Sequence, residues 1–279
     1  MTPTPLQVGI STCPNDTFAF HALLTGEVSD PELELHFELL DVEELNQGLA
    51  AGRYDIAKAS FHAALHLADE LITLPVGAAL GFGVGPVLLG RTGATPAPTA
   101  RVLCPGRWTT APLLWQLFHS GDGALEQRPF HEIIPALTSG AADLGVCIHE
   151  ARFTYREHGL DLIEDLGATW ERETNSPLPL GGLFARRSLP TELIRRMTGL
   201  IRASLAWARS HPDAALLSMR AHAQELDDDV LKEHVRLYVN HHTTDLGPVG
   251  EDALRALHNH AQAASLLPAQ SAPLIVFET

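Results

Sequence analysis

Apolar positions along the chain form short strand-like runs, and most of these runs lead into a segment with helical spacing. Residues 6–10 and 144–148 are mainly continuous apolar runs, whereas residues 33–40 alternate between apolar and polar positions. The first pattern predicts a buried strand and the second a half-buried strand. Residues 53–60 and 101–104 repeat the order of strand and then helix. This alternation predicts an α/β protein.

The last third of the chain has a different pattern, in which helical spacing dominates. Apolar residues between 193 and 205 recur on one helical face, which predicts an amphipathic helix. The same reasoning predicts helices over 227–238 and 251–267. Residues 170–180 are mostly polar and contain two prolines, so we expect a loop there.

Two glycine-rich stretches indicate how the chain is divided. Residues 75–90 and 180–186 combine small residues with strand-forming ones. The repeat Gly81-x-Gly83-x-Gly85 lacks the spacing of a dinucleotide-binding turn and does not lead into a helix, so we reject that function. Since 279 residues are too many for one ordinary core, we predict two strands that cross between two lobes. The predicted larger lobe comprises residues 1–88 and 187–279, and the smaller lobe comprises residues 89–186.

Composition and charge exclude several classes of partner. Hydrophobic residues make up 45% of the chain and charged residues 19%, and the formal net charge is 19 − 34 = −15. This balance is typical of a globular protein, and such a surface repels nucleic acid and anionic lipid. We therefore expect no nucleic acid and no membrane insertion, and no surplus apolar stripe indicates an oligomeric state. If Met1 is the natural start, the absence of a basic, apolar leader predicts a cytoplasmic protein with reduced cysteines.

Polar residues stand where several predicted strands end. His149 follows the apolar run 144–148, and Lys58 and Ser60 close the run 53–60. In an open α/β sheet, ligands bind beyond the carboxyl ends of the strands. An imidazole with an ordinary pKa of about 6.5 can accept a proton near neutral pH, which makes His149 a candidate general base. The alternative is a histidine that only hydrogen-bonds a loop at the end of its strand.

Two turns that open helices are candidate seats for an anion. Asn15 and Asp16 are predicted N-caps after the first strand, and Thr109 and Thr110 stand at a helix start in the second lobe. Free N–H groups at such starts bind carboxylates and phosphates. The alternative for each turn is an ordinary capped helix without a ligand.

The fifteen histidines raise the question of a metal site. His241 and His242 are adjacent, and His258 and His260 point to opposing faces of a helix. There is no HExxH motif, no Cys/His cluster and no GxSxG turn. We therefore predict solvent-exposed helix histidines, and we expect neither a metal nor a cofactor.

Several long segments together resemble one family. They are residues 10–18 (ISTCPNDTF), 55–60 (DIAKAS), 77–86 (GAALGFGVGP), 105–111 (PGRWTTA), 148–155 (IHEARFTY) and 178–182 (LPLGG). In this order they resemble the 1,4-dihydroxy-6-naphthoate synthase family of the futalosine route to menaquinone. The resemblance implies a two-lobed fold like that of type II periplasmic binding proteins, with a double-strand hinge and a cleft between the lobes.

The resemblance also implies a reaction and roles for individual residues. It implies a lyase that converts cyclic dehypoxanthinyl futalosine, a small carboxylate, into 1,4-dihydroxy-6-naphthoate without a cofactor. His149 matches the proton acceptor of the family, and two segments match its substrate-binding positions: Lys58, Ala59 and Ser60, and Thr109, Thr110 and Ala111. Asn15 and Asp16 are added as further candidates for substrate binding. Two alternatives stay open, the chorismate dehydratase of the same route and a non-catalytic protein that binds small carboxylates.

Overall fold

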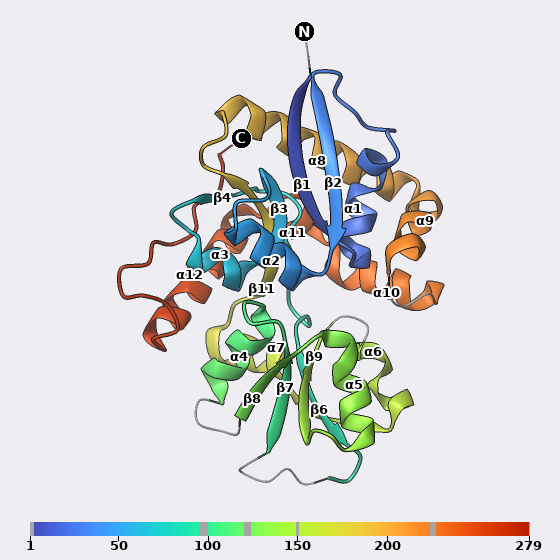
Figure 1. Cartoon of the computed structure of the whole chain (residues 1–279), viewed down its shortest axis with the longest axis vertical. Coiled ribbons are helices and arrows are strands. Elements are labelled where there is room, and N and C mark those ends of the chain that lie inside the picture. The colour runs from blue at the N-terminus through green and yellow to red at the C-terminus, as the bar shows by residue number, and fades with distance from the viewer. Residues whose placement is uncertain (1–2, 95–99, 120–123, 149–150, 224–226, 279) are drawn as a thin grey trace.

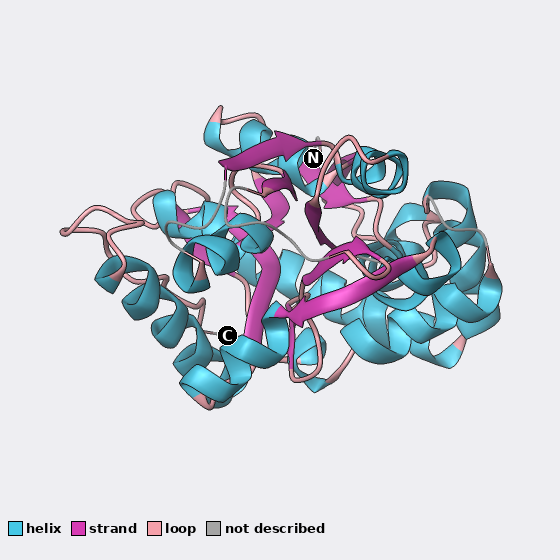
Figure 2. Cartoon of the chain, turned by 90° about the horizontal axis from the view of Figure 1, so that it is seen from below, coloured by secondary structure: helices cyan, strands magenta, loops and turns pink. Residues whose placement is uncertain are grey.

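The chain folds into two lobes, each built around its own β-sheet (Figure 1). The computed structural model describes residues 3–94, 100–119, 124–148, 151–223 and 227–278. Helices flank the strands of both lobes when the molecule is seen from below (Figure 2). Among the described residues, no helix is long and apolar enough to cross a membrane.

The first sheet has the strand order β2-β1-β3-β11-β4, and β5 pairs with β11 outside this path. β1 runs parallel to β2 and β3, whereas β11 runs antiparallel to its neighbours. The register places Gly9 beside Ala57 and Gly182 beside Ala59. The strands are β1 (Thr4–Ser11), β2 (Leu33–Leu40), β3 (Ile56–Ser60), β4 (Leu71–Thr73), β5 (Ala79–Gly81) and β11 (Leu178–Arg186).

The second sheet has the order β10-β6-β9-β7-β8. β7 is parallel to β8 and β9, and β6 is antiparallel to β9 and β10. All four residues of β9 are buried, as its apolar run predicts. The strands are β6 (Val87–Arg91), β7 (Arg101–Pro105), β8 (Ala124–Arg128), β9 (Leu144–Cys147) and β10 (Leu160–Asp165).

Helices cover both sheets. In the first lobe α1 packs against α8, α9 and α10, and the core there includes Phe20, Met197 and Leu205. In the second lobe α5 packs on β9. The first-lobe helices are α1 (Pro14–Leu24), α2 (Val42–Ala50), α3 (Phe61–His66), α8 (Thr191–Ser210), α9 (Pro212–His222), α10 (Asp228–Tyr238), α11 (His241–Thr244) and α12 (Gly247–Ala263). The others are α4 (Thr110–Phe118), α5 (Phe130–Ser139), α6 (Ala151–Thr154), the 3₁₀ turn η1 (Tyr155–His158) and α7 (Leu166–Thr174).

The chain passes between the sheets twice, and only the first crossing lies in a predicted position. It leaves β5 at Gly81 and enters β6 at Val87, within the glycine-rich stretch. Residues 180–186, which we expected to cross, lie within β11 and pair with the first sheet. The return therefore precedes β11, between α7 and Leu178. By sheet membership β11 belongs with the first lobe, whereas the predicted boundary at 186 assigns it to the second. The lobe boundaries themselves remain a prediction.

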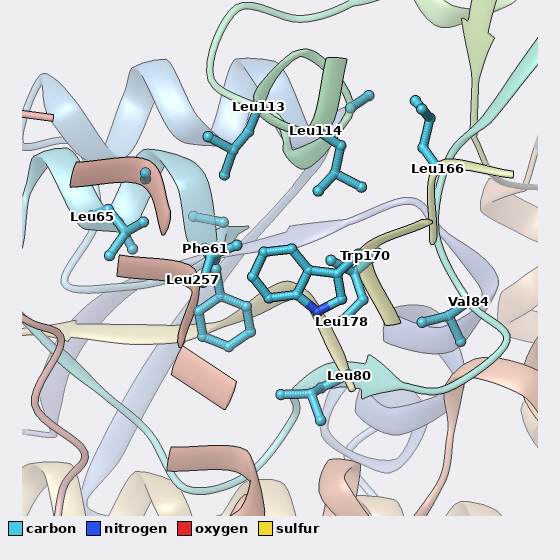
Figure 3. Packing of buried hydrophobic residues seen from close by; sticks show 14 of the residues in the cluster. Phe61, Leu65, Leu80, Val84, Leu113, Leu114, Leu166, Trp170, Leu178 and Leu257 are labelled. Atoms are coloured by element: carbon cyan, nitrogen blue, oxygen red, sulfur yellow. The ribbon is translucent and has the colours of Figure 1, made fainter. Parts of the chain in front are cut away.

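A continuous apolar cluster joins the two lobes on the side of α7. Trp170 is fully buried at its centre, and its indole N–H donates to the Pro177 carbonyl over 3.3 Å. Phe61 from the first lobe and Leu114 from the second lie around the indole ring (Figure 3). The predicted loop over residues 170–180 is wrong in its first part, because residues 170–174 belong to α7, which buries Trp170 and is capped by Asp165.

Two other sequence-based expectations are wrong. Helix α1 begins with Pro14 after Cys13 as N-cap, because proline is pre-organised for the first helical position. Asn15 and Asp16 therefore lie inside the first turn and are not caps. His242 and His258 are 4% and 6% exposed and hydrogen-bond backbone carbonyls of Leu246 and Ser271, so they are buried rather than solvent-exposed.

Candidate substrate-binding cavity

A cavity lies between the lobes, where the carboxyl ends of β1, β3, β7 and β9 meet. It collects seven of the predicted residues: Asn15, Asp16, Lys58, Ser60, Thr109, Thr110 and Ala111. Segments far apart in the sequence thus converge at one place, as the rule for ligands at strand ends predicts.

Two of the predicted residues stand differently. Ala59 does not line the cavity, because successive side chains of a strand alternate and its methyl group packs into the apolar core. His149 lies outside the described residues. Its covalent neighbour Ile148 lines the cavity directly after β9.

A buried ion pair forms one wall of the cavity. Lys58 Nζ lies 2.6 Å from Asp16 Oδ1, and both side chains are 5% exposed. The ammonium group also donates to the Gly77 carbonyl over 2.9 Å. Two hydrogen bonds hold Lys58 in place while the pair keeps this wall close to neutral.

Hydrogen bonds extend this wall to a helix that the sequence did not implicate. Asn15 Nδ2 donates to Asp16 Oδ1, and His234 Nε2 lies 3.1 Å from Asn15 Oδ1. Because an amide oxygen only accepts, the proton of this bond is on His234 Nε2. His234 comes from α10 and is 2% exposed.

Tyr238 lines the cavity one helical turn after His234. Burial raises the pKa of Tyr238 to about 12, so its hydroxyl stays protonated at neutral pH. Sequence reasoning missed both residues, although their i, i+4 spacing places them on one face of the predicted helix.

Another part of the cavity lining brings hydroxyl groups of the two lobes together. Ser60 Oγ lies 3.1 Å from Thr110 Oγ1, and the Thr110 hydroxyl donates to the Leu180 carbonyl over 2.9 Å. The Thr109 hydroxyl donates to the Pro105 carbonyl over 2.6 Å and makes no cap bond to the helix. Thr109 is thus the N-cap of α4 by position, but its side chain does not cap the helix.

The start of α4 offers backbone donors at this wall. The first N–H groups of a helix have no acceptor within it, and α4 begins with Thr110 and Ala111. Pro112 follows them and has no N–H. Two backbone N–H groups next to the Ser60 hydroxyl are suited to a carboxylate.

Buried polar side chains outside the cavity hold these walls together. Asn46 is fully buried, and its Oδ1 accepts from the Ser60 N–H over 2.9 Å. Its Nδ2 donates to Glu43 Oε2, which also accepts from the Trp108 N–H. Helix α2 of the first lobe thereby fixes the turn that precedes α4 in the second.

A wider cleft continues outward from the cavity. It shares Val42, Thr109 and Ile148 with the cavity, and Arg107 and Arg128 lie on its second-lobe side. The cavity and the cleft therefore adjoin at these three shared residues.

The described residues hold no group of three or more His, Cys, Asp or Glu side chains that could bind a metal ion. Of the ionisable groups in the cavity, Lys58 and Asp16 pair with each other, and Asn15 connects them to His234.

His62 should make the stability of the protein depend on pH. It lies behind the Ser60 wall and is 4% exposed, and burial lowers its pKa from 6.5 to about 4. The unfolded chain takes up a proton on this group below pH 6.5, whereas the folded chain does not. The free energy of unfolding should therefore fall by about 3 kcal/mol as the pH drops from 6.5 to 4. Urea unfolding at several pH values measures this free energy. In His62→Asn, the free energy of unfolding should fall less between pH 6.5 and 4. An equal slope in both proteins would contradict the prediction.

Comparisons with known proteins show which family the chain resembles. Residues 6–263 match a family described as menaquinone biosynthesis. A 1,4-dihydroxy-6-naphthoate synthase of Thermus thermophilus is 44% identical over 97% of this chain and 99% of its own length. One of Streptomyces coelicolor is 39% identical over 99% of this chain and 100% of its own.

Solved structures show the same fold. A protein of Archaeoglobus fulgidus is 32% identical with a TM-score of 0.89, covering 94% of this chain and 98% of its own. The periplasmic aliphatic sulphonate binding protein of Escherichia coli has a TM-score of 0.66 at 14% identity, covering 100% of this chain and 95% of its own. The expected periplasmic-binding-protein-like fold is thus confirmed. Together with the family match, these comparisons show that the chain belongs to the menaquinone biosynthesis family that includes the 1,4-dihydroxy-6-naphthoate synthases.

Proposed function

We propose that this protein is a lyase that converts cyclic dehypoxanthinyl futalosine into 1,4-dihydroxy-6-naphthoate. The observation that carries the proposal is the cavity between the lobes. It joins Lys58 and Ser60 of the first lobe to Thr110 and Ala111 of the second. These are the segments to which the family resemblance assigns substrate binding, and both named relatives carry this activity in their names.

The substrate carboxylate would bind where the hydroxyl groups meet the start of α4. The N–H groups of Thr110 and Ala111 supply neutral donors, which suit one negative charge in a partly enclosed site. On binding, the Ser60 hydroxyl would turn its one proton from Thr110 to the carboxylate. The positive charge of Lys58 is already offset by Asp16. The apolar side chains of Val42, Ile148 and Leu180 line the same cavity and would contact the aromatic ring.

The chemical step requires a base and the exclusion of water. In the proposed mechanism, His149 removes a proton from the sugar-derived part of the substrate. The electron pair left on carbon forms a new double bond as the bond to the sugar-derived fragment breaks. The fragment leaves with the bonding pair and takes up a proton, which His149 returns, and the second ring becomes aromatic. A neutral imidazole is suited to this role near pH 7. The Ser60 and Thr110 side chains meet across the lobes, 3.1 Å apart, and close the cavity on this side, which limits access of water to the reacting carbon.

The test is turnover by the purified protein without added metal. Cyclic dehypoxanthinyl futalosine should disappear and 1,4-dihydroxy-6-naphthoate should form, as followed by liquid chromatography and absorbance. Chorismate in a parallel reaction should remain unchanged. Dehydration of chorismate alone would show that the related dehydratase is the correct assignment. Tight binding of the futalosine derivative with no product would instead indicate a receptor-like protein.

A cytoplasmic location is part of the proposal, because a biosynthetic lyase acts where its substrate is made. Fractionation of cells that express the protein measures this, and recovery in the periplasmic fraction would favour the receptor function.

A further inference from the structure

Two histidines on α3 of the first lobe, His62 and His66, contact the residues that precede α4 in the second lobe. His62 and His66 stand four residues apart on α3, and their rings lie 5.2 Å apart. His62 Nδ1 lies 2.9 Å from the carbonyl oxygen of Thr109. His66 stacks on the ring of Trp108, with centroids 5.8 Å apart and an interplanar angle of 23°. Neither histidine lines the cavity.

The hydrogen bonds fix where the protons of this pair are. A carbonyl oxygen only accepts, so His62 Nδ1 carries its proton and donates to Thr109. Neutral His62 then has its lone pair on Nε2. His66 Nε2 lies 3.4 Å from that atom and must therefore be the donor to it. One consistent chain of donors thus runs from His66 through His62 to Thr109.

This series of hydrogen bonds ends at the residue before the proposed carboxylate-binding site (the seat), which is formed by Ser60 and the first N–H groups of α4. Thr109 is the N-cap of α4, and Thr110 and Ala111 follow it. His62 also contacts Ser60, because its backbone N–H donates to Ser60 Oγ over 3.2 Å. His62 therefore contacts both sides of the seat: its backbone N–H bonds Ser60, and its ring bonds Thr109.

We propose that His62 is a positioning residue that holds the start of α4 against Ser60 and so determines the affinity of the site for an aryl carboxylate. His66 supports it by donating to its second ring nitrogen and by packing on Trp108. This inference rests on the proposed function, since it assigns the carboxylate of that substrate to the seat. It assigns no chemical step to either histidine.

The test compares variants by calorimetric titration with 1,4-dihydroxy-6-naphthoate itself. His62→Leu removes the donor, and we expect the dissociation constant to rise about tenfold, which corresponds to the loss of one hydrogen bond of ordinary strength. His62→Asn keeps an N–H close to the position of Nδ1 and should bind within about threefold of the native protein. In turnover, His62→Leu should raise KM by a similar factor and change kcat much less.

The protein offers a matched control for a purely structural effect. His242 is 4% exposed, and its Nδ1 also faces a backbone carbonyl, that of Leu246 at 3.1 Å. This contact lies away from the cavity. His242→Leu should lower the melting temperature much as His62→Leu does and leave the dissociation constant unchanged.

The outcomes separate this inference from the proposed function. Native affinity in His62→Leu, or an equal loss in His62→Asn, would overturn the inference and leave the proposed function intact. An equal loss of affinity in His242→Leu would also overturn it, because destabilisation alone would then explain the effect. A native protein that does not bind the naphthoate would overturn the proposed function and this inference together.

Discussion

Replacing His149 with alanine should lower kcat by roughly 10²–10⁴-fold, which is the usual cost of losing a general base. The expectation rests on the family resemblance and on the position of Ile148, the preceding residue, in the cavity wall. Binding should be largely retained, because the groups assigned to the carboxylate are on Ser60 and the start of α4. Single-turnover kinetics measures the chemical step, and titration with the naphthoate measures binding.

The pH dependence of this reaction gives a second readout. If His149 is the base, kcat of the native protein should decrease when the pH drops below the pKa of that imidazole. The residual rate of His149→Ala should lack this pH dependence. His36→Ala is a suitable control, since His36 is exposed on β2 and does not line the cavity. Turnover that survives in His149→Ala at the native rate would exclude the proposed base.

Replacing Lys58 with methionine should destabilise the fold by about 3–5 kcal/mol, because it removes the positive charge that offsets the buried carboxylate of Asp16. Both side chains are 5% exposed and 2.6 Å apart. The variant should also lose affinity for the substrate, since Lys58 lines the cavity. Urea unfolding followed by circular dichroism measures the first effect.

Two further variants test whether the uncompensated charge of Asp16 causes the loss of stability in Lys58→Met. Lys58→Met combined with Asp16→Leu removes both charges and should be more stable than Lys58→Met alone. Lys232→Met removes an exposed lysine on α10 and should change stability by no more than about 0.5 kcal/mol. A loss below about 1 kcal/mol in Lys58→Met would mean that water or nearby groups already compensate Asp16.

The sequence by itself determined the local elements and the positions of most candidate residues. Burial patterns are local, so the apolar run before His149 and the alternation over 33–40 correctly predicted β9 and β2. The same patterns placed Lys58 at a strand end and Thr110 at a helix start, and the fold brings both to one cavity. The family resemblance supplied the roles that periodicity and spacing do not carry.

The tertiary structure decided which of these groups meet. Asn15 and His234 are separated by 219 residues, and Ser60 and Thr110 by 50, yet each pair is in hydrogen-bonding distance. No local pattern encodes such pairs, because they depend on how helices and sheets pack after they form. Long-range packing also accounts for the errors in the predicted elements. Residues 170–174 are helical because α7 buries Trp170 between the lobes. Residues 180–186 do not cross between the lobes because β11 pairs with β3 in the first sheet. Residue type and spacing thus fixed the parts of the site, and long-range packing fixed their partners.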